Sequence, residues 1–63
     1  MVRWEREPGG SYRLGVTGWW VYRRNGRWVI RYWERRQGET RLLREAKALA
    51  EGWYVYPGTR PCR

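Results

Sequence analysis

Apolar and polar residues alternate along most of this chain, in short runs separated by turn residues. Alternation with a period of two is typical of β-strands that bury one face. The segments with this pattern are residues 2–7, 11–16, 19–24 and 27–34. The turn signals between or after them are Pro8-Gly9-Gly10, Thr17-Gly18, Asn25-Gly26 and Gln37-Gly38. Together they predict a small antiparallel β-meander of about three to five strands.

The strongest turn signal is Asn25-Gly26, because a two-residue type I′ hairpin loop needs positive φ at both central residues. A hairpin centred there pairs Trp20 with Arg31. A second two-residue loop, at residues 17–18, pairs Leu14 with Val21. The two loops agree on one apolar sheet face, since side chains alternate across a strand. The residues of that face are Tyr12, Leu14, Val16, Trp19, Val21, Trp28, Ile30 and Tyr32.

The opposite face of the predicted sheet is rich in arginine and aromatic residues. No acidic residue is expected on it, since each Glu falls elsewhere in this register. Arg forms forked hydrogen bonds with phosphates and guanine edges, and aromatic rings offer stacking surfaces. The candidate nucleic-acid-binding residues are Arg13, Trp20, Tyr22, Arg24, Arg27, Arg31, Trp33 and Arg35.

We expect one helix over residues 42–52, with its C-terminal end at Gly52. Leu42, Ala46, Leu49 and Trp53 recur at the spacing of one helix face, which we expect to pack across the apolar sheet face. Gly52 suits the position just after a helix. Lys47 and Glu51 should pair on the outer side of the helix, as should Arg41 and Glu45.

The domain organisation expected is a single domain over residues 1–63, of class α+β, with the helix packed across one face of the meander. Residues 1–10 are an N-terminal strand or arm, and residues 11–42 are the meander. Residues 39–42 allow at most a short third strand, with Glu34 opposite Arg41. Residues 53–63 should form a short strand and a tail.

The amino-acid composition limits the classes of function that this protein can have. The formal net charge is +8, and thirteen of the fourteen basic residues are Arg, which favours an anionic partner. There is no His and no Asp, and Cys62 is the only thiol, so we expect no enzyme, no metal site and no cofactor. The charged N-terminus does not fit a signal peptide, and no apolar run approaches the roughly 20 residues of a membrane span. A cytoplasmic location with no membrane partner is expected.

A meander followed by one helix resembles the small DNA-binding domains of plant ethylene-response transcription factors and the arm-binding domains of phage integrases. The likeness lies in Asn25-Gly26-Arg27-Trp28 and Leu43-Arg44-Glu45-Ala46 and covers residues 19–52. It implies that the sheet enters the DNA major groove. The contacting positions that it implies are Trp20, Tyr22, Arg24, Arg27, Arg31 and Trp33.

The chain as a whole also resembles small orphan proteins of actinobacterial phages, in Trp4, the Gly-Arg-Trp strand and the segment LREAKALAE. This implies a phage protein that acts in the cytoplasm of its host. The leading hypothesis is a DNA-binding protein, either a monomer or a weak homodimer. The alternatives are a module that binds a host protein through the exposed Trp, Tyr and Arg face, and a homodimer that buries this face.

Overall fold

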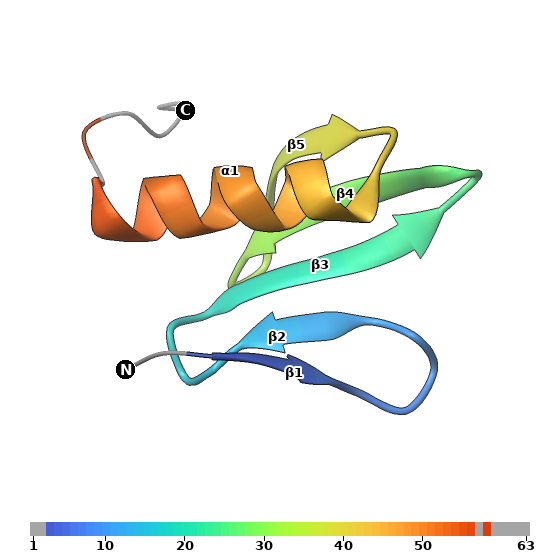
Figure 1. Cartoon of the computed structure of the whole chain (residues 1–63), viewed down its shortest axis with the longest axis horizontal. Coiled ribbons are helices and arrows are strands. Elements are labelled where there is room, and N and C mark those ends of the chain that lie inside the picture. The colour runs from blue at the N-terminus through green and yellow to red at the C-terminus, as the bar shows by residue number, and fades with distance from the viewer. Residues whose placement is uncertain (1–2, 57, 59–63) are drawn as a thin grey trace.

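A five-stranded antiparallel sheet and one helix make up the computed structural model, which describes residues 3–56 and 58. The elements are β1 (Trp4–Arg6), β2 (Tyr12–Leu14), β3 (Trp19–Arg24), β4 (Arg27–Tyr32), β5 (Arg35–Thr40) and α1 (Leu43–Val55). Consecutive strands are neighbours in the sheet, and α1 lies over one of its faces (Figure 1). The predicted α+β meander with a C-terminal helix is confirmed. Most of the predicted tail, residues 57 and 59–63, lies outside the described residues, as do residues 1–2.

The β3–β4 hairpin has the predicted turn and register. Asn25 and Gly26 have φ angles of 54° and 77°, as a type I′ loop requires. Trp20 lies opposite Arg31, as expected from the turn alone. Local turn chemistry is therefore sufficient to place these two strands.

The β2–β3 connection is longer than predicted. Tyr12 lies opposite Val21, so the register is shifted by two residues from the one expected. The Thr17 hydroxyl donates to the Leu14 carbonyl at 2.7 Å, which closes a wider loop. An even shift leaves every strand side chain on its predicted face. Val16, however, falls in the loop and is 91% exposed, so its predicted place in the core is wrong.

The β4–β5 turn occurs at Trp33-Glu34, and the predicted reversal at Gln37-Gly38 is wrong, as is the pairing of Glu34 with Arg41. Trp33 has a φ of 54°, an uncommon conformation for a large residue. Its amide donates to the Gly18 carbonyl at 2.7 Å, and a Cβ on Gly18 would lie only 2.5 Å from its ring. This contact between distant loops fixes a turn that strand propensity does not reveal.

The helix continues through Gly52 to Val55, so the predicted end at Gly52 and the predicted strand over residues 53–56 are both wrong. Trp53 packs against Trp19, with ring centroids 5.8 Å apart. This packing stabilises the additional helical turn despite the glycine within it. No helix of the described residues is long and apolar enough to cross a bilayer.

The core lies between α1 and one sheet face. Ala46 and Ala50 are buried in it, whereas Leu42 and Leu49 are 44% and 41% exposed, so these leucines do not face the sheet as predicted. The fully or nearly buried apolar residues of this core are Leu14, Trp19, Val21, Ile30, Ala46 and Ala50. The small alanines let the helix approach the bulky sheet residues closely.

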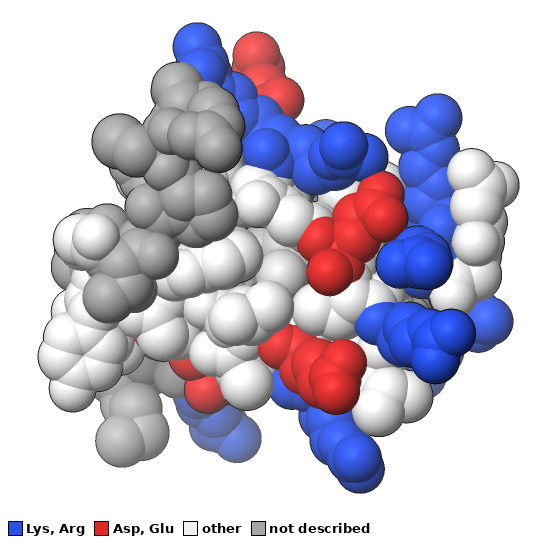
Figure 2. Space-filling view, turned by 90° about the horizontal axis from the view of Figure 1, so that it is seen from above, with Lys and Arg blue, Asp and Glu red and all other residues white. Residues whose placement is uncertain are grey.

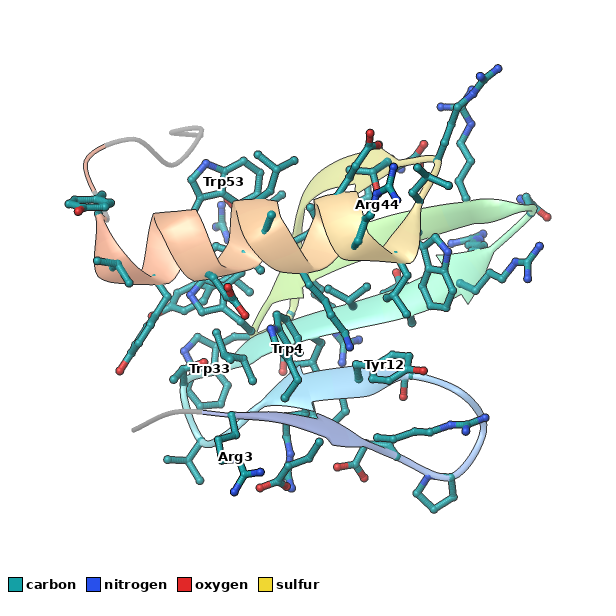
Figure 3. All side chains as sticks on the ribbon, in the orientation of Figure 1. Arg3, Trp4, Tyr12, Trp33, Arg44 and Trp53 are labelled. Atoms are coloured by element: carbon teal, nitrogen blue, oxygen red, sulfur yellow. The ribbon has the colours of Figure 1, made fainter. Side chains whose placement is uncertain are left out.

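The predicted pairs along α1 are not formed. Lys47 lies over the Tyr12 ring, 4.2 Å from its centroid, and Glu51 accepts a hydrogen bond of 2.6 Å from the Trp4 indole. Trp4 and Tyr12 lie on the α1 side of the β1–β2 hairpin (Figure 3). Lys47 and Glu51 therefore hold this hairpin to the helix, instead of pairing with each other.

Candidate nucleic-acid interface

The sheet face opposite α1, here called the outer face, carries the arginine and aromatic residues. Side-chain alternation and the observed registers place on it Glu5, Arg13, Trp20, Tyr22, Arg24, Arg27, Val29, Arg31, Arg36 and Glu39. One row crosses all five strands and contains Glu5, Arg13, Trp20, Arg31 and Arg36. Six of the eight predicted site residues belong to this face.

Arginines stack on the aromatic rings of the outer face. The Arg31 guanidinium lies 5.5 Å from the Trp20 centroid and 5.6 Å from that of Tyr22. Arg13 lies 5.8 Å from the Trp20 ring. Arginine side chains therefore lie against the Trp20 and Tyr22 rings, which were expected to stack on bases. In the structure these rings hold guanidinium groups in place.

Arg31 is a constrained cation of this surface. Its side chain is half buried, and its Nε is buried without a hydrogen-bond acceptor among the described residues. A buried N–H without an acceptor costs about 1–3 kcal/mol, which the two ring contacts partly offset. Its remaining donors are therefore held in a preferred direction before any ligand arrives.

Acidic residues also occupy this side of the sheet, so the expectation of an acid-free face is wrong. Arg13 pairs with Glu5 at 2.7 Å, and its Nε lies 3.2 Å from the Glu7 carboxylate without hydrogen-bond alignment. Arg36 pairs with Glu39 at 2.9 Å. These acids reach the face because β1 joins the sheet and β5 is a full strand with a register shift near Ile30 and Arg31.

Two predicted site residues lie elsewhere. Trp33 lies in the β4–β5 turn, is 58% exposed and contacts the β2–β3 connection (Figure 3). Arg35 is opposite Tyr32, on the α1 side of the sheet. Arg35 was expected to continue the outer face of the strand that contains Arg31, but that strand ends at Tyr32, and the irregularity in β5 puts Arg36 opposite Arg31. Arg36 and Glu39 were therefore missed, and no local signal marks this bulge.

A cavity of about 370 Å³ opens on the outer face beside the β3–β4 turn. Val29 is only 2% exposed and lies at its base, and Tyr22 contributes to its wall. The remaining lining residues are Arg24, Asn25, Arg27, Arg36 and Glu39. Three guanidinium groups and one carboxylate thus surround an apolar base.

Charge is unevenly distributed when the molecule is viewed from the side of α1 and β5. Most of the Lys and Arg atoms gather toward one end, where the β3–β4 turn and the start of α1 lie, with acidic residues among them (Figure 2). The described residues that this view shows at the other end are mostly uncharged (Figure 2). The basic end coincides with the end of the outer face that holds the cavity.

The described residues contain no group of three or more His, Cys, Asp or Glu side chains positioned to hold a metal ion. Searches of protein-family models, curated proteins and solved structures found no match to this chain. The residues of the interface themselves indicate its chemistry. They offer positive charge, forked donors and braced aromatic rings.

Proposed function

We propose that this protein binds nucleic acid, with duplex DNA favoured, through the outer face at the β3–β4 hairpin. The observation that carries the proposal is the convergence of Arg24, Arg27 and Arg36 around one cavity, next to the braced Arg31. Arg24, Arg27 and Arg31 form no ion pair with any described residue. Their charge is therefore available to phosphates.

The width of the sheet supports contact through the hairpin and not through the whole face. Five strands spaced about 4.8 Å apart span roughly 19 Å, more than the roughly 12 Å of a B-DNA major groove. The described pairing of β2 with β3 ends at Val21, whereas β5 stays paired with β4 as far as Trp28, so only β3, β4 and β5 continue toward the turn. Three strands span roughly 10 Å, which fits the major groove. We therefore favour contact by the hairpin over the whole-sheet contact that the resemblance implies.

Binding should be tested by fluorescence anisotropy with random duplex DNA and single-stranded DNA at two salt concentrations. Four phosphate contacts would give a slope of about −3 to −4 in log affinity against log salt. Combining Arg24→Glu with Arg27→Glu should abolish binding. The matched control combines Arg6→Glu with Arg44→Glu, which changes the net charge equally on exposed residues off the outer face. Equal losses from both variants, or no binding at low salt, would refute the proposal.

A protein partner is the second candidate. The last turns of α1 expose large apolar residues: Leu49 is 41%, Tyr54 41% and Val55 58% exposed. Apolar groups gathered in this way are typical of protein interfaces. This surface differs from the outer face, so Leu49→Ser would weaken a protein contact or a homodimer and leave DNA binding intact. Light scattering at micromolar concentration measures self-association. The proposed setting remains the cytoplasm of a phage-infected host.

A further inference from the structure

The cavity beside the β3–β4 turn has the size of a small-ligand site and a mostly polar lining. Its volume of about 370 Å³ is near the lower end of the roughly 300–1,000 Å³ typical of such sites. Residues of β3, β4 and β5 line it, so hydrogen-bonded strands hold most of its walls. A site on strands is held more rigidly than a site on loops.

The lining residues indicate a ligand with a flat part and an anionic part. Val29 and Tyr22 provide an apolar base and an aromatic wall. Arg24, Arg27 and Arg36 provide forked donors for a phosphate. An apolar ligand would offer no acceptor to the Arg24 and Arg27 guanidinium groups, so it fits the lining poorly.

The carboxylate in the wall argues against a bare phosphate. Glu39 accepts from Arg36 at 2.9 Å and, as an ionised carboxylate, retains further acceptor sites. Negative charge at this position would repel a second anion. A nucleobase offers ring N–H or amino donors to such an acceptor. The phosphate of a nucleotide can therefore pair with the arginines of the lining while its base donates to Glu39.

We propose that this cavity takes one unpaired nucleotide of a nucleic-acid strand, with its base above Val29 and its phosphate against Arg24, Arg27 and Arg36. This inference rests on the proposed function, because it assumes that the hairpin contacts nucleic acid. A paired base must first leave the stack, whereas an unpaired base avoids most of that cost. The protein should therefore prefer DNA that contains an unpaired nucleotide.

The test compares a fully paired duplex with the same duplex carrying one central unpaired nucleotide, 2-aminopurine. We expect about tenfold tighter binding to the second, measured by anisotropy, and a change in 2-aminopurine fluorescence as the base enters the cavity. Equal affinity for the two duplexes would overturn the inference while leaving the proposed function standing.

Two substitutions of one exposed residue separate cavity filling from charge. Glu39→Trp places a large ring in the cavity, whereas Glu39→Gln removes the same charge and leaves the space open. We expect Glu39→Trp to bind the two duplexes with equal affinity, and Glu39→Gln to keep at least half of the preference for the unpaired nucleotide. An unchanged preference in Glu39→Trp would place the unpaired nucleotide outside the cavity and overturn the inference.

A free nucleotide tests the cavity without any duplex. NMR titration with a nucleoside 5′-monophosphate should shift the amide signals of Tyr22 and Val29 at millimolar concentration, and inorganic phosphate should shift them several-fold less. Shifts in a protein that fails to bind any duplex would refute the proposed function and retain the cavity as a nucleotide site. Equal shifts with inorganic phosphate would show an anion site only, and absent shifts would show no site; both would overturn the inference.

Discussion

Trp19 and Trp20 are neighbours in the chain and lie on opposite faces of β3, where the same side chain has different surroundings. Trp19 is 2% exposed and packs against Tyr32 and Trp53, with centroids 4.7 Å and 5.8 Å away. Trp20 is half buried and lies between Arg13 and Arg31. Aromatic residues on the α1 side thus fill the core, while those on the outer face hold cations.

The same comparison extends to the cations that contact aromatic rings. Lys47 lies between α1 and the β1–β2 hairpin, over Tyr12 and Trp4, so its contacts join two parts of the fold. Arg31 contacts Trp20 and Tyr22 within the sheet, and its remaining guanidinium donors are left for a ligand. A cation–π contact therefore indicates structure or binding only once the surrounding elements are known.

Replacing the core tryptophan should have the largest effect. Trp19→Ala should cost about 3–5 kcal/mol of unfolding free energy, because it empties the centre of the core. A domain of this size has only roughly 3–9 kcal/mol in total. Urea unfolding followed by circular dichroism should show that about half or more of the unfolding free energy is lost. An unchanged urea midpoint would show that the core does not depend on this ring.

Replacing its neighbour should affect binding more than stability. Trp20→Ala removes the ring that holds Arg31, so DNA affinity should fall about fivefold, which corresponds to about 1 kcal/mol. The protein should remain folded in the same urea titration. Anisotropy with a duplex measures the affinity. A loss of stability as large as that of Trp19→Ala, with unchanged affinity in the remaining folded protein, would remove the distinction between the two faces.

Removing the helix-side cation should have a smaller effect, on stability alone. Lys47→Ala should lower the unfolding free energy by about 0.5–1 kcal/mol, because it deletes the contacts with Tyr12 and Trp4. Arg44→Ala is the control, since Arg44 is an exposed cation on the same helix. The two variants should bind DNA equally. A specific loss of binding in Lys47→Ala would place this lysine in the interface.

Releasing Arg13 from one of its two acidic partners should have the smallest effect. Glu5→Gln leaves Arg13 free of a 2.7 Å ion pair, so affinity for DNA at low salt should rise about twofold. Glu45→Gln on α1 removes the same charge away from the outer face. An equal rise in both variants would mean that only net charge matters, and that Arg13 has no specific role.

Three of the errors of prediction depend on contacts with other parts of the fold. Trp33 forms a turn because Gly18 accepts its amide and leaves space for its ring. Gly52 stays helical where Trp53 reaches Trp19. Glu39 joins the outer face because β5 pairs in full with β4, across a register shift. None of these contacts leaves a periodic signal in the sequence.

The sequence by itself determined which residues alternate between the two faces of the central hairpin, because the Asn25-Gly26 turn has one favoured geometry and strand alternation follows from it. It also determined the excess of positive charge. Only the tertiary structure decided that Glu5 and Glu39 share the face of Trp20 and Tyr22, and that a cavity forms over Val29. The physical reason is that these features depend on how β1 and β5 pair with the central strands, and long-range packing sets that pairing.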